Sequence, residues 1–408
     1  MSKTRVAVLF GGRSPEHDVS IVSGLQALNA LDSAKYEGFP VYLAADGAWF
    51  TGDALRDRAT YIPDEEARRG LTRVDLDLSA GRGRLVPRGQ GGFQGGLLGG
   101  LFAKAPAPVE FDVALLSFHG NIGEDGQIQG VFETANVPYT GMRTLASAVL
   151  MDKAITKRVL AGRGISLLPD AVIPRPATGL VPDKAGLEAA LRNIAFPVIV
   201  KPAHLGSSIG VAKADDLDAV RAVLPNIFKF DTSAIIEPFV ENLVEYNVAV
   251  RRQDGAVVTS AIERPKRTAE LLDFKEKYLS GGGKKSGGKQ PGASSQGMLS
   301  LTRDIGPDLP AALEGSIRHW ASEAFAAVSG TGAPRIDFLS NEKTGEVWLN
   351  EVNPCPGSFG YFLWEAAEKP VLFTALLDRL IEEAKLCHRA VQLPSDPTPS
   401  DARLFKRS

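Results

Sequence analysis

The sequence predicts an α/β protein that begins with a parallel α/β domain. Strand-like apolar runs alternate with helix-like segments through the first third of the chain, as in domains where helices connect parallel strands. The chain also has 408 residues, too many for one ordinary hydrophobic core, so we expect two or three domains.

The expected N-terminal domain covers residues 1–145. Residues 6–10 (VAVLF) and 113–120 (VALLSFHG) are apolar enough to form buried strands. Residues 18–31 have the apolar spacing of a helix, with Asp18 as its expected cap.

Two further units are expected at 146–240 and 241–393. Residues 151–164 should form a helix that ends at Gly164. The remaining expected elements are two strands joined by a glycine-serine loop at 196–214, strands at 233–241 and 245–252, and a helix near 311–328.

Three segments lack the pattern of regular structure. Residues 44–110 look irregular and are expected to form an insertion of loops. Residues 277–297 are rich in Gly, Ser and Lys, which indicates a surface loop or a lid. Residues 394–408 are expected to be a frayed tail.

The composition excludes several classes of protein. The 46 basic and 48 acidic residues leave a net charge of −2, which gives no argument for binding nucleic acid or a membrane. No stretch approaches the ~18 apolar residues of a membrane span, and the first residues do not follow a signal-peptide pattern. Cys355 and Cys387 make no disulfide framework, so we expect a cytoplasmic protein.

Residues 335–353 read as a β-hairpin with a tight turn at 343–345, where Gly345 can adopt the left-handed conformation. In this register four apolar side chains are expected on one face: Ile336, Phe338, Trp348 and Val352.

The opposite face of the hairpin would carry only polar groups. Asp337 would lie opposite Glu351, and Arg335 opposite Asn353. Two opposed carboxylates repel each other, whereas a divalent metal would convert the repulsion into attraction, and their oxygens suit magnesium. A solvated face neutralised by Arg335 explains the hairpin equally well.

Basic residues and small-residue loops point to phosphate. Lys201 ends a predicted strand and precedes the loop 206–210 (GSSIG), which lacks the ending of a Walker loop but offers backbone N–H groups to an anion. Lys153 and Lys157 share one helix face. Solvated lysines and an ordinary hairpin are the alternative.

Two acidic loops follow N-terminal strands. Residues 119–130 (HGNIGEDGQIQG) follow a strand end, where open α/β sheets bind ligands. Residues 11–18 (GGRSPEHD) place Glu16 and His17 in a strand-to-helix turn, but do not match GxGxxG, which counts against a dehydrogenase. Each loop could instead be a surface turn.

In this order the motifs resemble the D-alanine–D-alanine ligase family of ATP-grasp enzymes. The resemblance rests on GGRSPEHDVSIVSG, HGNIGEDGQIQGVFETANVPYTG, MDKAITK, FPVIVKPAHLGSSIGV, DFKEKY and RIDF…LNEVNPCPG. It implies that two α+β ATP-grasp lobes follow the N-terminal domain. It also implies an ADP-forming ligase that joins two D-alanines for peptidoglycan, and a homodimer.

The resemblance also implies roles for individual residues. Lys153, Lys201, Lys277 and the loop residues Ser207 and Ser208 would hold ATP phosphates; Glu237 and the backbone of Pro238, Phe239 and Val240 would face adenine; and Glu245 would bind the ribose. Asp337, Glu351 and Asn353 would bind two Mg²⁺ ions, with Mn²⁺ as a possible substitute. Arg335 would contact the transferring phosphate.

On the amino-acid side, Glu16 would bind the ammonium of the first D-alanine with His119 nearby, Ser207 and Tyr278 would connect to Glu16, and Gly357 would donate its N–H to the oxyanion. Phe362 replaces the serine that family members usually carry near the acceptor's carboxylate, and Ser358 is a candidate substitute. The acceptor therefore stays open between D-alanine and another amine or hydroxy acid. A non-catalytic ATP-binding protein is a further alternative.

Overall fold

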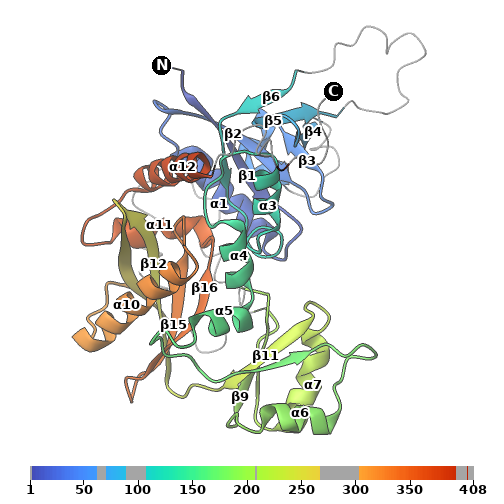
Figure 1. The fold of residues 1–408 in the computed structure, drawn as a ribbon, viewed down its shortest axis with the longest axis vertical. Helices are drawn as coiled ribbons and strands as arrows, with labels where there is room; N and C mark the ends of the chain where they lie inside the picture. The colour runs from blue at the N-terminus through green and yellow to red at the C-terminus, as the bar shows by residue number, and fades with distance from the viewer. Residues whose placement is uncertain are drawn as a thin grey trace, which may run out of the picture.

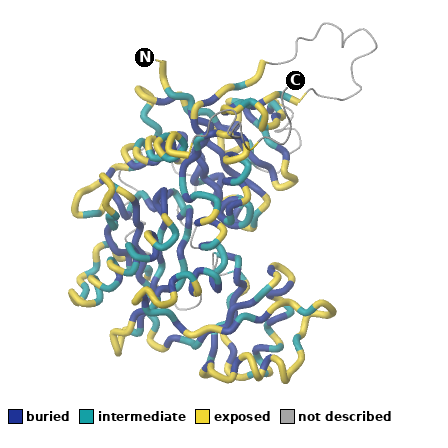
Figure 2. Tube along the Cα trace, in the orientation of Figure 1, coloured by how far each residue is buried: buried dark blue, intermediate teal, exposed yellow. Residues whose placement is uncertain are grey.

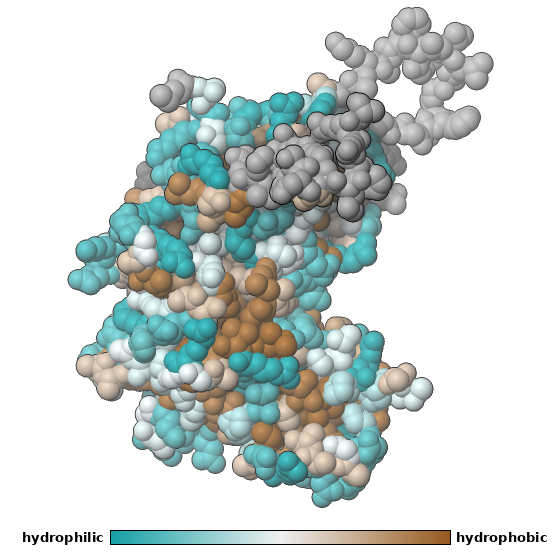
Figure 3. All heavy atoms as spheres, in the orientation of Figure 1, coloured by the Kyte–Doolittle hydropathy of each residue, from teal (hydrophilic) through white to brown (hydrophobic). Residues whose placement is uncertain are grey.

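The computed structural model describes residues 2–61, 70–88, 107–206, 209–266 and 303–391, together with Ala402. Within these ranges the chain forms three sheets of seven, four and five strands (Figure 1). Buried residues concentrate in the strands and in the helices that cover them (Figure 2). Polar side chains cover most of the face in view, and apolar side chains gather near its middle (Figure 3).

The N-terminal sheet has the order β6-β5-β4-β3-β2-β1-β7. Its parallel part consists of β1 (Thr4–Gly11), β2 (Tyr36–Leu43) and β7 (Val113–Leu116). This part agrees with the predicted parallel α/β arrangement. Helix α1 (His17–Ala30) begins directly after Glu16, so Asp18 lies in its first turn and the expected cap was wrong.

The segment 44–110 extends the same sheet, so the prediction of an irregular insertion was wrong for its described residues. It contributes four short antiparallel strands: β3 (Trp49–Thr51), β4 (Thr72–Leu76), β5 (Gly83–Pro87) and β6 (Val109–Phe111). Strands this short show little periodicity in their sequence. Their backbone groups hydrogen-bond to neighbouring strands, which the local sequence does not reveal.

The central sheet has the order β10-β9-β11-β8 and is antiparallel. Its strands are β8 (Ala171–Pro174), β9 (Val198–Pro202), β10 (Ala212–Ala214) and β11 (Ser233–Pro238). Helices α6 (Lys184–Leu191) and α7 (Leu217–Ile227) pack against it and bury a core of aliphatic side chains (Figure 1). The predicted strand-loop-strand at 196–214 is confirmed at β9 and β10.

Three helices connect the N-terminal sheet to this lobe: α3 (Gln127–Thr134), α4 (Thr144–Met151) and α5 (Lys153–Leu160). The predicted helix at 151–164 corresponds to α5, but α5 ends at Leu160, so the end expected at Gly164 was wrong. It begins at the N-cap Asp152, whose side chain accepts hydrogen bonds from two backbone N–H groups of the first turn.

The C-terminal sheet has the order β14-β13-β12-β15-β16 and is antiparallel. Its strands are β12 (Leu243–Gln253), β13 (Ala256–Pro265), β14 (Arg303–Ile305), β15 (Arg335–Asn341) and β16 (Val347–Asn353). Helix α10 (Ala311–Ala327) packs on the sheet and confirms the helix predicted near 311–328.

The end of the described chain returns to the N-terminal sheet (Figure 1). After η3 (Gly357–Gly360) and α11 (Tyr361–Glu365), helix α12 (Phe373–Ala390) shares one hydrophobic core with β1 and α1. Leu376 and Ile381 of α12 are fully buried in this core together with Val6 and Phe10. The shared core holds the segment after β16 against the N-terminal sheet.

The hairpin β15–β16 has the predicted register at its open end. Arg335 pairs with Asn353 and Asp337 with Glu351, whereas Phe338 pairs with Leu349. The extra residue on β16 forms a β-bulge, so the side chains of β16 between the bulge and the turn point to the opposite face from the one predicted. Val347 and Leu349 are therefore the buried residues there, and Trp348, expected among them, is only half-buried. Gly345 adopts the predicted left-handed conformation, with φ of 74°.

None of the helices in the described ranges is long and apolar enough to cross a membrane. The predictions for 277–297 and 394–408 concern residues outside these ranges, apart from Ala402.

Candidate active site

The polar face of the hairpin gathers the four predicted side chains. Arg335 donates from Nε and Nη2 to the two oxygens of Asp337, both at 2.6 Å, and Asn353 Nδ2 donates to the same carboxylate at 2.9 Å. Burial raises the pKa of Asp337 to about 6, although Arg335 acts in the opposite direction. The half-buried carboxylate of Asp337 is thus held by one cation and one amide.

Two lysines from the central lobe reach this face. Lys153, the first residue of α5, lies with Nζ 3.3 Å from Glu351 Oε2, and Lys201 at the end of β9 donates to Asn350 Oδ1 at 2.9 Å. Burial opposes ionisation of Glu351, but Lys153 and Lys201 outweigh it and lower its pKa. The bulge places Asn350 and Glu351 where each meets one lysine.

Glu237 on β11 joins the same cluster. Its Oε2 lies 2.6 Å from Lys201 Nζ, and its Oε1 forms a buried ion pair with Lys157. Lys157 also donates to the carbonyl of Leu168 at 2.8 Å. The sequence argument left Lys157 as a solvated lysine, but it is buried. Its position one turn after Lys153 was the only available signal.

The remaining residues expected at the nucleotide lie around this cluster. Pro238 is half-buried and Val240 is buried. The Phe239 N–H donates to the carbonyl of Pro197 at 2.9 Å, so this N–H is already occupied. Glu245 on β12 is half-buried and close enough to Asp337 to raise the pKa of that carboxyl. Ser207, Ser208, Lys277 and Tyr278 lie outside the described residues.

A pocket of about 350 Å³, partly continuous with solvent, opens beside the hairpin. Its polar lining brings together Glu16, Glu124, Lys153, Glu351 and Asn353. These residues come from the N-terminal loops, from α5 and from β16. The pocket therefore lies where the three parts of the chain meet.

The acidic end of the pocket is tightly built. Gly120 has φ of 72°, which strains any residue with a side chain, and a Cβ there would lie 2.6 Å from Glu16 Oε2 and would displace that carboxylate. Glu124 accepts hydrogen bonds from the backbone N–H groups of Gly120 at 2.7 Å and Cys355 at 2.8 Å. Burial, followed by the charge of Glu16, raises the pKa of Glu124 to about 8. Sequence reasoning gave Glu124 no individual role.

His119 is buried, and both of its ring nitrogens face protein atoms. Nδ1 lies 2.8 Å from the Cys355 carbonyl oxygen, and Nε2 lies 2.8 Å from Ser23 Oγ. Ser23 Oγ also accepts the N–H of Ser358 at 2.9 Å. Burial lowers the pKa of His119 to about 4. The Ser358 hydroxyl hydrogen-bonds with Gln26, and Gly357 precedes it in the chain.

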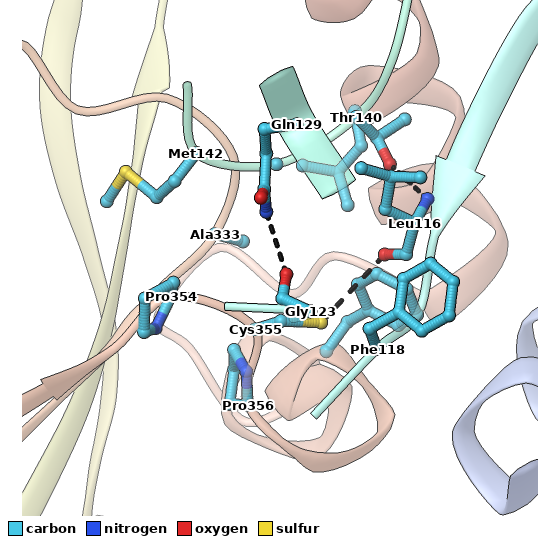
Figure 4. Close-up of a pocket in the computed structure, with 13 residues that line it drawn as sticks. Leu116, Phe118, Gly123, Gln129, Thr140, Met142, Ala333, Pro354, Cys355 and Pro356 are labelled. Carbon is cyan, nitrogen blue, oxygen red and sulfur yellow. Dashed lines mark hydrogen bonds between the residues drawn. The ribbon is translucent and has the colours of Figure 1, made fainter. Parts of the chain in front are cut away.

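A second, mostly apolar pocket of about 410 Å³, also partly continuous with solvent, is lined by residues 354–356 and by residues of the N-terminal domain (Figure 4). Pro354, Cys355 and Pro356 form one wall, and Gln129 points across the cavity to donate to the Gly123 carbonyl at 2.8 Å. Most of its lining is apolar, unlike that of the charged pocket beside the hairpin.

His204 forms a cluster that sequence reasoning missed. Its Nδ1 lies 2.8 Å from Asp231 Oδ1, and its Nε2 lies 3.2 Å from Oδ2 of Asp152, the N-cap of α5. The hydrogen bonds to Asp152 and Asp231 raise the pKa of His204 to about 10, so the imidazole is charged at neutral pH. The cluster ties the loop after β9 to the helix that begins with Lys153.

Two antiparallel lobes that hold lysines and paired carboxylates between them, behind an α/β domain, define the ATP-grasp class of fold. The family models described as "D-ala D-ala ligase N-terminus" and "D-ala D-ala ligase C-terminus" match residues 5–142 and 160–382. The chain belongs to the D-alanine–D-alanine ligase family.

Individual relatives match over nearly the whole length. D-alanine–D-alanine ligase A of Bradyrhizobium diazoefficiens is 33% identical over 96% of this chain and 97% of its own. The ligase of Thermosipho africanus is also 33% identical, over 93% of this chain and 92% of its own.

Solved structures show the same fold. The D-alanine–D-alanine ligase from Coxiella burnetii has a TM-score of 0.73 at 24% identity, and the match covers 96% of each chain. The VanG D-Ala:D-Ser ligase from Enterococcus faecalis has a TM-score of 0.68 at 23% identity and covers 94% of this chain and 100% of its own.

Proposed function

We propose that this protein is an ATP-dependent ligase that joins two D-alanines through a D-alanyl phosphate intermediate and supplies the dipeptide for peptidoglycan. The main support is that Lys153 and Lys201 both lower the pKa of Glu351, the carboxylate that lies opposite Asp337 on the hairpin. Phosphoryl transfer needs this kind of positioning and charge neutralisation more than covalent help.

The nucleotide would lie between the two antiparallel lobes. Lys153 and Lys201 would leave their carboxylate partners for ATP phosphates, and Glu237, held by Lys157, would face the adenine amino group. The further nucleotide contacts in this proposal are the backbone of Pro238 to Val240, Glu245, and Ser207, Ser208 and Lys277 outside the described residues.

The hairpin residues fit magnesium by their donor atoms. Asp337, Glu351 and Asn353 offer carboxylate and amide oxygens on one face, and the carboxylates are met by Arg335 and Lys153. Among the described residues, no group of three or more His, Cys, Asp or Glu could hold a metal, so this set depends on the amide of Asn353. Two Mg²⁺ ions, or Mn²⁺, would neutralise the charge on the phosphates.

The amino-acid substrates would occupy the pocket beside the hairpin. Glu16 would bind the ammonium of the first D-alanine. The carboxylate of that D-alanine would then attack the γ-phosphorus of ATP, and ADP would leave. The amine of the second D-alanine then attacks the acyl carbon, loses a proton and displaces phosphate. Arg335 would contact the transferring phosphate, and the N–H of Gly357 would stabilise the oxyanion.

The acceptor has a second candidate, another amino acid or a hydroxy acid. Phe362 is half-buried, and the Arg303 guanidinium lies 4.7 Å from the centre of its ring. A phenyl ring cannot hydrogen-bond a carboxylate as a serine would, so Ser358 or the backbone near Gly357 would have to do so. The phenyl ring at this position is therefore the observation that favours an acceptor other than D-alanine.

Product analysis with D-alanine and D-lactate in competition tests the proposal. We expect D-alanine-dependent ADP release and mainly D-alanyl-D-alanine at neutral pH. Tyr278→Phe should raise the share of ester, because it removes the hydroxyl whose hydrogen bond, worth about 1 kcal/mol, the family resemblance associates with an amine acceptor. Absence of dipeptide contradicts the acceptor assignment, and absence of ADP release with any D-amino acid contradicts the ligase.

The assembly and location are parts of the same proposal. We expect a homodimer, which light scattering of the purified protein will test. We expect the enzyme to work in the cytoplasm, and fractionation of cells that express it will test this.

A further inference from the structure

The short segment from Cys355 to Ser358 is held at both ends by the N-terminal domain. The Cys355 N–H donates to Glu124 at 2.8 Å, and its carbonyl oxygen lies 2.8 Å from His119 Nδ1. At the other end the Ser358 N–H donates to Ser23 Oγ at 2.9 Å. Gly357 lies between these anchors, so they constrain the direction of its own N–H.

The hydrogen-bond directions along this path are determined by chemistry. A carbonyl oxygen only accepts, so His119 must carry a proton on Nδ1. In the neutral ring Nε2 then accepts the hydroxyl proton of Ser23, whose oxygen remains open to the Ser358 N–H. The Cys355 carbonyl therefore sets the tautomer of the histidine, and the buried Ser23 hydroxyl connects that ring to the Ser358 N–H of the turn.

The turn after Gly357 needs such an anchor. Ser358, Phe359 and Gly360 have backbone φ angles of 50°, 58° and 59°. Residues other than glycine rarely adopt such angles. Runs of this kind persist only where surrounding contacts over-determine them. The buried ring of Phe359 in the shared core supplies one constraint, and Ser23 supplies the other.

We propose that Ser23 is a positioning residue which, through His119 and the Ser358 N–H, aims the backbone N–H of Gly357 at the reacting acyl group. This inference rests on the proposed ligase function for its kinetic consequence. It also gives His119 a supporting role through the Cys355 carbonyl in place of direct substrate contact.

Ser23→Ala is the test, and Ser20→Ala is its matched control. Ser20 lies one turn earlier on α1, is equally buried, and also has two hydrogen bonds, from the Gly11 N–H at 2.8 Å and to the Ser117 carbonyl at 2.7 Å. Loss of the Ser23 oxygen should speed hydrogen exchange of the Ser358 amide by about tenfold. Ser20→Ala should leave that amide unchanged.

The kinetic measurement separates positioning from general damage. We expect Ser23→Ala to lower kcat about tenfold with the KM for ATP unchanged, because the lost contact acts on the acyl centre. Ser20→Ala should leave both within twofold. Equal kcat for Ser23→Ala and the wild type, or equal losses in both variants, overturns the proposal.

An independent measurement needs no turnover. The ¹⁵N shifts of His119 in the wild type should show a neutral ring with the proton on Nδ1 throughout pH 6–8. A proton on Nε2, or a charged ring in that range, overturns the proposed path even if the enzyme is active. If the wild type uses a different acceptor, the ligase assignment changes, but exchange, tautomer and kcat with that acceptor still decide the role of Ser23.

Discussion

Glu351→Gln is the most direct test of the paired carboxylates, because it removes one charge with almost no change in shape. Glu351 lies opposite Asp337 and its Oε2 is 3.3 Å from Lys153 Nζ. Both carboxylates are partly shielded by the lobes, so charge interactions here are stronger than in water.

Two effects of this substitution can be estimated. Loss of a strong electrostatic stabiliser of the transition state costs about 3–4 kcal/mol, which is about 10²–10³-fold in kcat. Without metal, Lys153 would lose its charged hydrogen-bond partner and keep the carbonyl of Leu205, at 2.7 Å. That loss should reduce the free energy of unfolding by about 1–3 kcal/mol.

The assay is ADP release at saturating ATP and D-alanine over a magnesium titration, with Mn²⁺ binding followed by electron paramagnetic resonance. We expect weaker metal binding and at least ~10²-fold lower turnover. Glu346→Gln is the control, because Glu346 lies exposed at the turn of the same hairpin and should leave both unchanged. Near wild-type turnover of Glu351→Gln at limiting magnesium would refute the metal assignment.

Two further predictions concern ion pairs of the central lobe. The pKa of His204 is raised from 6.5 to about 10 by Asp152 and Asp231, so the folded state binds the proton more tightly than the unfolded state. The stabilisation is therefore complete below pH ~6.5 and is lost as the pH rises to about 10. In urea unfolding, the free energies of unfolding of the wild type and His204→Gln should differ at pH 6 and converge towards pH 10. A difference that does not change with pH would contradict the ion pairs of His204 with Asp152 and Asp231. Lys157→Met removes one cation from the buried Glu237 carboxylate, so we expect at least ~3 kcal/mol lower stability and a raised KM for ATP, measured by unfolding and kinetics; an unchanged KM would leave Lys157 without influence on the nucleotide.

Local patterns determined much of this architecture. The hairpin β15–β16 pairs as predicted at Asp337 and Glu351 because alternation and a glycine turn act over fewer than about twenty residues. Helix α10 and the strands β9 and β11 were predicted for the same reason, since periodicity is a local property. The family resemblance rested on such motifs in order along the chain.

Other features depended on contacts that no local pattern carries. The strands within 44–110 are stabilised by pairing at the edge of the N-terminal sheet. The bulge at Asn350 moved Trp348 away from the buried face, and the lysines that contact Asn350 and Glu351 come from another lobe. Lys157 is buried because Glu237, 80 residues later, supplies its counter-charge.

The sequence by itself determined which residues carry the acidic, basic and glycine-rich chemistry, because side-chain type and local spacing are written along the chain. Only the tertiary structure decided that Ser23, His119 and Cys355 form one path, since they are 96 and 236 residues apart. Hydrogen bonds act over about 3 Å in space, whatever the separation in sequence. The hydrogen bonds that join Ser23, His119 and Cys355 near Gly357 could therefore be recognised only from the folded structure, in which the N-terminal sheet and helix α12 share one hydrophobic core.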